Sequence, residues 1–365
     1  MKETHMKIIE KKKIIIENNN SIFNYFGWPT IGRLNDTTLA VVCSGFRLRH
    51  VCPFGKVVMS ISHDEGKTWT KPAPIIDTPL DDRDAGICVD GNRVIVTSFN
   101  NDIAFQRTNI QKCMDGGDTS NKLKLMGAYL DNVSDEECQK FLGSTYTVSH
   151  DGGNTFGDVK ICPVSSPHGP TKLKDGRILY VGKIFAPSGV ASPIACAVLD
   201  ENENFNILSY VPEGADEYGE CLNCEPHAIE LDDGSILVAI RAQRYRGNNL
   251  FTVFLTKSTD GCKTFSKPQM VIGRESGSPP HLMIHSSGTI VMTYARRKDN
   301  YGIRAIVSKD NGNTWSDEIV LTDDASGGDL GYPSTIERND HSLITVWYER
   351  DEIGSPIKQL IWDLD

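Results

Sequence analysis

Short runs in which apolar and polar residues alternate fill most of the chain, and Asp- and Gly-rich segments separate them. Alternation with a period of two predicts β-strands, because successive side chains of a strand point to opposite faces. Four such runs lead into one octet, Ser-x-Asp-x-x-x-Thr-aromatic with an internal Gly, at residues 62–69, 149–156, 258–265 and 308–315. Asp and Gly favour turn conformations, and the aromatic residue begins a return strand. Each octet therefore predicts a β-hairpin.

A longer repeat sets the number of structural units. Its pattern is a Pro or similar residue, a few strand residues, a polar turn and an apolar strand. The units begin at Trp28, Asp84, His168, Glu225, Pro279 and Tyr332. Each unit predicts a four-stranded sheet, and four of the six carry the octet in their outer hairpin. Because a lone sheet of this kind cannot bury both faces, we expect one all-β domain over 1–365, a six-bladed β-propeller.

Residues 107–143 interrupt the second unit. Within them, Ser134 and Glu137 have capping-box spacing and predict a short helix near 138–142. Residues 115–122 predict an exposed loop. An insertion of this length forms a lid, an interface or a surface decoration. The last unit is one strand short, and we expect the alternating residues 11–17 to supply that strand and close the ring.

The net charge of −10 over 365 residues argues against nucleic acid or an anionic membrane as a partner. The chain has no apolar run of membrane-spanning length and no secretory leader, so we expect a cytoplasmic protein. Its ten cysteines do not fit a small disulfide scaffold. The sequence leaves open whether the protein forms a homo-oligomer.

Functional groups of a propeller are expected near the axis, where the innermost strands begin. The unit starts supply Trp28, Asp84, His168, Glu225, His227, His281 and Tyr332. The ends of the second strands supply Arg47, Arg241 and either Arg296 or Arg297. So many ionisable side chains around one point predict a site rather than a purely structural axis.

The octet resembles the Asp-box, or BNR repeat, of the sialidase (neuraminidase) superfamily. Residues 225–241 are similar to the sialidase segment in which a Glu begins one strand and an Arg ends the next. Residues 331–334, Gly-Tyr-Pro-Ser, resemble the later segment that supplies the nucleophile. The resemblance implies that Tyr332 is the nucleophile and Glu225 its base. It also implies that Arg241 and Arg304 belong to a triad of arginines that binds the carboxylate of an acidic sugar.

Elementary chemistry is consistent with these roles. A tyrosine with a pKa near 10 needs a base at neutral pH, and a carboxylate can take its proton. A neutral nucleophile suits an anionic sugar, which would repel a second carboxylate. Arginine binds a carboxylate through two parallel hydrogen bonds. In the alternative interpretation, Glu225 forms a salt bridge with Arg241 and Tyr332 is a packed ring.

The sequence also departs from the sialidase pattern. Gly27 stands where sialidases have the first arginine of the triad, and residues 48–56, where their acidic Asp is expected, contain no carboxylate. His50 is the remaining candidate acid in that segment. We also expect Asp84 to point inward as a catalytic carboxyl, and the rest of residues 81–84 to pair structurally.

The axis histidines admit three interpretations. His168, His227 and His281 could bind sugar hydroxyls or act as acids and bases. They could hold a metal with Glu225 or Asp84, beside Cys221 and Cys224. They could also be structural.

We predict an exo-glycoside hydrolase that removes a terminal acidic sugar without a cofactor, and carbohydrate as its partner. Two alternatives stay open. One is a lyase on uronic-acid oligosaccharides that uses a Tyr/His pair. The other is a glycan-binding propeller without catalysis.

Overall fold

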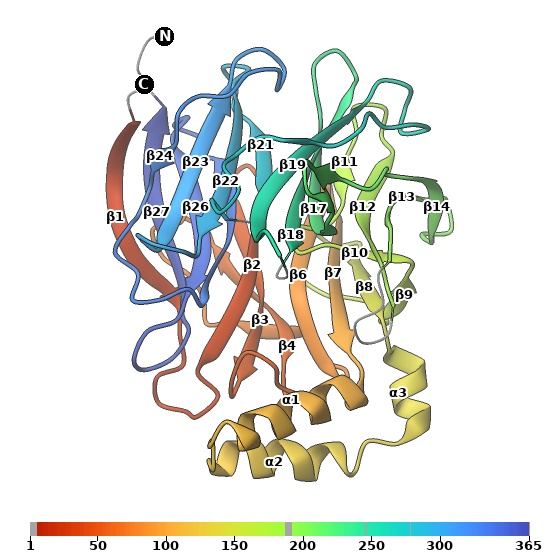
Figure 1. The fold of residues 1–365 in the computed structure, drawn as a ribbon, viewed down its shortest axis with the longest axis vertical. Coiled ribbons are helices and arrows are strands. Elements are labelled where there is room, and N and C mark those ends of the chain that lie inside the picture. Colours follow the sequence, from red (N-terminus) through yellow and green to blue (C-terminus); the bar gives the residue numbers. More distant parts are fainter. Residues whose placement is uncertain (1–5, 187–191, 245–246, 278, 365) are drawn as a thin grey trace.

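Six antiparallel sheets surround a central axis in the computed structural model of the protein, which describes residues 6–186, 192–244, 247–277 and 279–364 (Figure 1). The predicted six-bladed β-propeller is therefore confirmed. The first two blades consist of β2 (Tyr25–Asn35), β3 (Thr38–Arg47), β4 (Lys56–Ser62) and β5 (Ala73–Ile76), then β6 (Asp81–Asp90), β7 (Arg93–Asn101), β8 (Ser144–Ser149) and β9 (Lys160–Cys162).

In the third blade the inner strand is split into two short pieces that pair with the same neighbour. This blade consists of β10 (Val164–Ser165), β11 (Thr171–Lys172), β12 (Ile178–Ile184), β13 (Ile194–Leu199) and β14 (Phe205–Tyr210). A small hairpin, β15 (Ala215–Asp216) and β16 (Gly219–Glu220), leads to the fourth blade. That blade consists of β17 (Leu222–Glu230), β18 (Ile236–Arg244), β19 (Leu250–Ser258) and β20 (Gln269–Met270).

The two ends of the chain meet in the sixth blade. The fifth blade consists of β21 (His281–Ile284), β22 (Ile290–Arg296), β23 (Gly302–Ser308) and β24 (Ile319–Val320). The sixth consists of β25 (Leu330–Glu337), β26 (Leu343–Glu349), β27 (Ile357–Leu364) and β1 (Met6–Ile16). Because β1 pairs antiparallel with β27, the start of the chain supplies the outermost strand of the last blade.

All four octets form the same hydrogen-bonded turn. In each, the Thr hydroxyl donates to the Asp carboxylate at 2.6 Å, and the Ser hydroxyl donates to its other oxygen. The backbone N–H of the fifth residue donates to the Ser hydroxyl. These bonds stabilise the ionised carboxylate and hold the pKa of Asp64, Asp260 and Asp310 at about 2. The octets are therefore structural turns.

The core lies between neighbouring blades. Each large apolar cluster draws its residues mainly from two adjacent sheets, such as Val41 and Ile31 of the first blade with Ile344 and Ile361 of the sixth. This face-to-face packing is why the blades need one another. Among the described residues, no helix is long and apolar enough to cross a membrane.

The insertion in the second blade is more helical than the sequence indicated. It contains α1 (Ile103–Asp115), α2 (Asn121–Leu130) and α3 (Asp135–Phe141), which lie at one end of the propeller (Figure 1). The capping box of Ser134 and Glu137 starts α3 as predicted. The earlier helices form because α2 buries apolar residues against residues 48–52 of the first blade, a tertiary contact that the local pattern does not reveal.

Candidate active site

The inner strands of four blades each contain a non-glycine residue with positive φ. They are Trp28 (φ 55°), Asp84 (48°), Glu225 (50°) and Tyr332 (54°). The pairing register of each strand shifts at that residue, which is the mark of a β-bulge. Left-handed backbone costs a bulky residue on the order of 1–3 kcal/mol, and bulges within strands are over-represented beside active sites. The four bulges therefore mark one site near the axis.

The structure brings Tyr332, Glu225 and Arg241 into one hydrogen-bonded group. The hydroxyl of Tyr332 donates to Oε1 of Glu225 at 2.7 Å. Nη1 of Arg241 donates to the other carboxylate oxygen, Oε2, at 2.6 Å and to the Tyr332 hydroxyl at 3.3 Å. The salt bridge and the tyrosine–carboxylate contact thus exist together. One carboxylate is positioned to accept the phenolic proton while Arg241 holds it in place.

Burial and the surrounding charges together control the ionisation of Tyr332. Burial, followed by the charges of Glu225 and Asp84, raises its pKa well above the ordinary value, whereas Arg241 and Arg297 lower it. The guanidinium of Arg297 lies 5.3 Å from the centre of the Tyr332 ring. The phenol is therefore protonated at neutral pH and gives up its proton only to a base in contact with it, which is Glu225.

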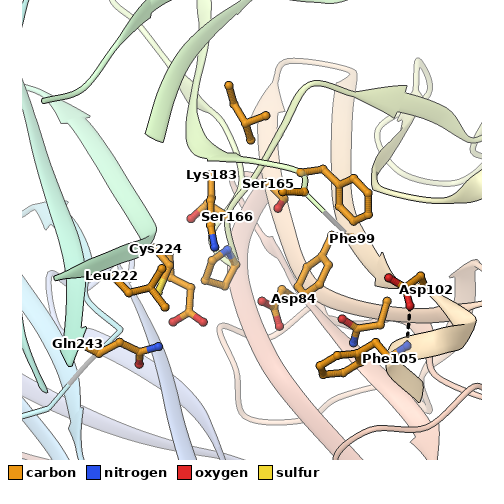
Figure 2. Close-up of a pocket in the computed structure, with 16 residues that line it drawn as sticks. Asp84, Phe99, Asp102, Phe105, Ser165, Ser166, Lys183, Leu222, Cys224 and Gln243 are labelled. Carbon is orange, nitrogen blue, oxygen red and sulfur yellow. Dashed lines mark hydrogen bonds between the residues drawn. The ribbon is translucent and has the colours of Figure 1, made fainter. Parts of the chain in front are cut away.

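Asp84 and Glu225 line one cavity of about 410 Å³ between the second, third and fourth blades (Figure 2). Asp84 is 6% exposed, and among the described groups its Oδ1 has no hydrogen-bond partner. Burial raises the pKa of Asp84 to about 7, against the opposing charge of Arg83. A buried carboxyl that holds its proton near neutrality and faces a cavity is suited to general-acid chemistry.

His50 belongs to a neighbouring set of contacts rather than to this cavity wall. Its Nδ1 lies 2.8 Å from the Tyr25 hydroxyl and 3.3 Å from the Asp329 carboxylate. Its ring packs edge-on against Trp28, whose indole also packs against Tyr332. Packing among Trp28 and Tyr25, with the charges of Arg83 and Arg47, lowers the pKa of His50, although 46% of its side chain is exposed. The ring is therefore mainly neutral near pH 7 and is a poor proton donor to a leaving group.

Arg47 is fully buried, and its guanidinium is engaged by Asp81 at 2.5 Å and by the backbone oxygen of His50 at 2.7 Å. The reason lies in the strand register. Arg241 pairs with the residue before the bulge of its blade, and in the first blade the equivalent position is Ser44, not Arg47. The sequence-based prediction placed Arg47 at the axis because it took the last residue of the second strand and ignored the bulges. The structure instead gives it a supporting contact under the Trp28 ring.

The structure also does not bring Arg304 to Tyr332. Arg304 is 2% exposed, and it binds Glu318 at 3.0 Å and the backbone oxygen of Asn300 at 2.7 Å. Two other arginines lie close to the aromatic rings of the site. Arg297 lies over Tyr332, and Arg83 lies 4.0 Å from the centre of the Trp28 ring. Arg83 was expected to be structural, although it directly precedes the inward-facing Asp84.

The three axis histidines form a buried cluster in which His227 and His281 stack and His168 lies edge-on to them. The ring centres of His227 and His281 are 4.4 Å apart, and His168 lies 4.8 Å from His281. Backbone N–H groups of Leu282 and Thr335 donate to Nδ1 of His227 and His281. Burial lowers the pKa of all three, so they are neutral. Within the described part of the chain, no group of three or more His, Cys, Asp or Glu residues is arranged to hold a metal ion.

The place of the missing triad arginine is filled by tyrosines. A side chain at Gly27 would meet the rings of Tyr25 and Tyr348, and the hydroxyls of both tyrosines donate to Asp329. Tyr348 pairs with Gly331, just before the bulge of the sixth blade, so it is the counterpart of Arg241. Considering every residue type at these positions, and not arginine alone, would have identified it.

Comparison with known proteins identifies one matching family model and several solved structures with a similar fold. Residues 168–345 match the BNR repeat-like domain, whereas no curated protein matches the sequence. The structure is similar to a protein of unknown function from Dyadobacter fermentans, with a TM-score of 0.77 and 18% identity over 99% of both chains.

Sialidases have the same fold. A mutant of NanB sialidase from Streptococcus pneumoniae aligns with a TM-score of 0.67 and 13% identity, over 96% of this chain and 70% of that one. Trypanosoma rangeli sialidase in complex with sialic acid aligns with a TM-score of 0.61 and 14% identity. This second match covers 99% of this chain but only 59% of the trypanosomal one. At these identities the likeness to sialidases shows the fold alone, and the predicted resemblance to BNR-repeat proteins is confirmed over residues 168–345.

Proposed function

We propose that this BNR-repeat propeller, which has the sialidase fold, is a glycoside hydrolase that removes a terminal acidic sugar from a glycan. One observation carries the proposal. The Tyr332 hydroxyl is 2.7 Å from a Glu225 oxygen, and Glu225 shares a cavity with Asp84, a carboxyl whose pKa is about 7. Nucleophile, base and acid are the three groups that a double displacement requires.

In the first step, the phenolic oxygen of Tyr332 attacks the anomeric carbon while Glu225 accepts its proton. Asp84 gives its proton to the departing glycosidic oxygen, and the bond to the leaving group breaks. In the second step, the Asp84 carboxylate accepts a proton from water, which attacks the same carbon. Tyr332 then leaves and recovers its proton from Glu225, so both carboxyls return to their starting states.

An acidic sugar is favoured by the cations around the tyrosine. Arg241, Arg297 and Arg83 all lie around the rings of Tyr332 and Trp28. Arginine matches the geometry of a carboxylate. A tyrosine nucleophile also adds no negative charge before its proton is removed, which suits an anionic substrate. His50 acts here as a positioning group for Trp28 rather than as the acid.

The test is a panel of aryl glycosides of acidic and neutral sugars, with product analysis by NMR. We expect turnover of an acidic member, and Tyr332→Phe should remove most of it while binding persists. Tyr146→Phe is the matched control. The hydroxyl of this buried tyrosine donates to the backbone oxygen of Glu203, which lies between β13 and β14 in the outer part of the third blade. An unsaturated product would instead identify a lyase. Binding without turnover by the unaltered protein would identify a glycan-binding propeller.

A further inference from the structure

The third octet departs from the other three at its fifth residue. That residue is Gly66, Gly153 or Gly312 in the other octets, with φ of 83°, 91° and 81°. In the third octet it is Cys262, with φ 71°, and its N–H still donates to the Ser258 hydroxyl at 3.0 Å. Left-handed backbone disfavours any residue with a Cβ. The thiol therefore stands where this turn prefers glycine, and its contacts must explain its presence.

The fifth residue of an octet faces the blade that precedes it around the ring. A Cβ added at Gly66 of the first blade would meet Ile344 of the sixth at 2.5 Å. A Cβ added at Gly312 of the fifth blade would meet Leu237 of the fourth at 3.0 Å. The side chain of Cys262, at the same place in the fourth blade, is therefore directed at the third blade.

The group that Cys262 meets there is Cys196 of β13. Both cysteines have 0% exposure and lie in one apolar cluster built from the third and fourth blades. Their thiols are hydrogen-bond partners. Ser209, which pairs with Cys196 across β13 and β14, also donates from its hydroxyl to the Cys262 backbone oxygen at 2.5 Å. Two thiols from different blades are thus held against each other.

The two thiols differ in acidity. The hydrogen bond from Cys196, together with the positive charge of Arg177, lowers the pKa of Cys262 despite its burial and the charges of Asp260 and Glu230. The same hydrogen bond, together with burial, raises the pKa of Cys196. Because the thiolate is the reactive form of cysteine, Cys262 is the nucleophile of the pair and Cys196 the thiol that resolves its oxidised form.

We propose that Cys196 and Cys262 form a redox site, in which a reversible disulfide joins the third blade to the fourth. The oxidant is a hydroperoxide. It reaches the pair when the octet turn opens locally, because Gly261 is half-buried and Lys263 is exposed on either side of Cys262. The inference does not rest on the proposed function, and its tests do not measure turnover.

The reaction with hydrogen peroxide balances in two steps. The Cys262 thiolate attacks one peroxide oxygen, the O–O bond breaks, and hydroxide leaves a sulfenic acid on Cys262. The Cys196 sulfur then attacks the Cys262 sulfur, the S–O bond breaks, and the departing hydroxide takes the Cys196 proton. The first hydroxide takes up the proton that Cys262 lost on ionisation. Two thiols are thereby oxidised to one disulfide, and the peroxide is reduced to two waters.

The first experiment maps the disulfide in the unaltered protein, so it does not depend on a variant that folds. The protein is treated with hydrogen peroxide, its remaining thiols are alkylated in denaturant, and it is digested without reductant for mass spectrometry. We expect one crosslinked pair of peptides, containing Cys196 and Cys262, that dithiothreitol separates. Alkylation of both thiols, crosslinks confined to other cysteines, or sulfinic acid on Cys262 without a crosslink would overturn the proposal.

The second experiment compares the Tm after peroxide with the Tm in dithiothreitol. A disulfide that closes a long loop should raise the Tm of the unaltered protein by about 5 °C. Cys262→Gly, which restores the residue of the other octets, and Cys196→Ser should each abolish the rise. Cys43→Ser, at an equally buried cysteine of β3, is the matched control and should keep it. Equal Tm values for the two forms of the unaltered protein, or a rise that persists in Cys262→Gly, would overturn the inter-blade disulfide.

Discussion

Replacing Asp84 by Asn should remove a pH dependence that the structure assigns to one buried carboxyl. Burial raises its pKa from the ordinary 3.8 to about 7. A group with a raised pKa stabilises the fold fully below its unfolded pKa and loses that contribution as pH rises through its folded pKa. Wild-type stability should therefore fall between about pH 4 and pH 7, and Asp84→Asn should not show this part of the fall.

The magnitude follows from the two pKa values. The difference between 3.8 and about 7 corresponds to about 4 kcal/mol at about 1.36 kcal/mol per pKa unit. The assay is urea unfolding of both proteins at several pH values between 4 and 8. As pH rises from 4 to 8, the unfolding free energy of Asp84→Asn should increase relative to that of the wild type by about this amount. Asp82, whose pKa is also raised to about 7, titrates in both proteins. Its contribution to the pH dependence therefore cancels when the two unfolding free energies are subtracted.

Activity measurements distinguish Asp84 from Asp82. Asp84→Asn should lower kcat by about 10²–10⁴ for unactivated substrates and least for aryl leaving groups, since the lost step is proton donation. The wild-type rate should fall as pH rises through about 7, because the acid must be protonated. Asp82→Asn, at a buried carboxylate that accepts from Thr78, should change the stability profile alone. An unchanged pH–stability curve for Asp84→Asn, or full activity, would refute the reasoning.

Three other changes test separate parts of the structure. Tyr332→Phe and Glu225→Gln should each remove most turnover, and the double variant should lose little more because the pair acts as a unit; steady-state kinetics of all three proteins checks this. Asp310→Asn should lower the Tm at pH 7, because the depressed pKa of Asp310 stabilises the fold above about pH 4. The difference in Tm between the two proteins should disappear as pH falls toward 2. A difference that stays constant with pH would contradict this role of Asp310. Gly86→Ala should cost about 2 kcal/mol or more by urea unfolding, because its Cβ would meet the backbone of Gly169. Gly127→Ala in α2, where the added Cβ meets nothing within 4 Å, is the control and should not destabilise the fold.

The repeats made the fold predictable because each carries its own turn chemistry. Four octets with one hydrogen-bond pattern, and a regular return of strand pairs, define blades without any long-range information. The helices of the insertion were largely missed, since α2 is stabilised by burial against the first blade. That contact is tertiary, and the local sequence of α2 does not show it.

The site was partly predictable for a related reason. Glu225, Tyr332 and Asp84 stand at the starts of three sequence units, so their shared place near the axis followed from the repeat. Arg47 was misplaced because a bulge shifts the register by residues that a linear count ignores. Arg304 satisfies the spacing of a triad arginine, yet its side chain binds Glu318. Strand order is local information, whereas side-chain direction depends on bulges and on neighbouring blades.

The identity of the nucleophile is the centre of the proposed mechanism, and trapping it is the most direct test. An activated fluorosugar of the acidic substrate, with a second fluorine that slows hydrolysis of the intermediate, should label the intact protein once. Peptide mapping by mass spectrometry should place that label on Tyr332, and Glu225→Gln should slow its formation. A label on Asp84 or Glu225, or full turnover by Tyr332→Phe, would contradict the account.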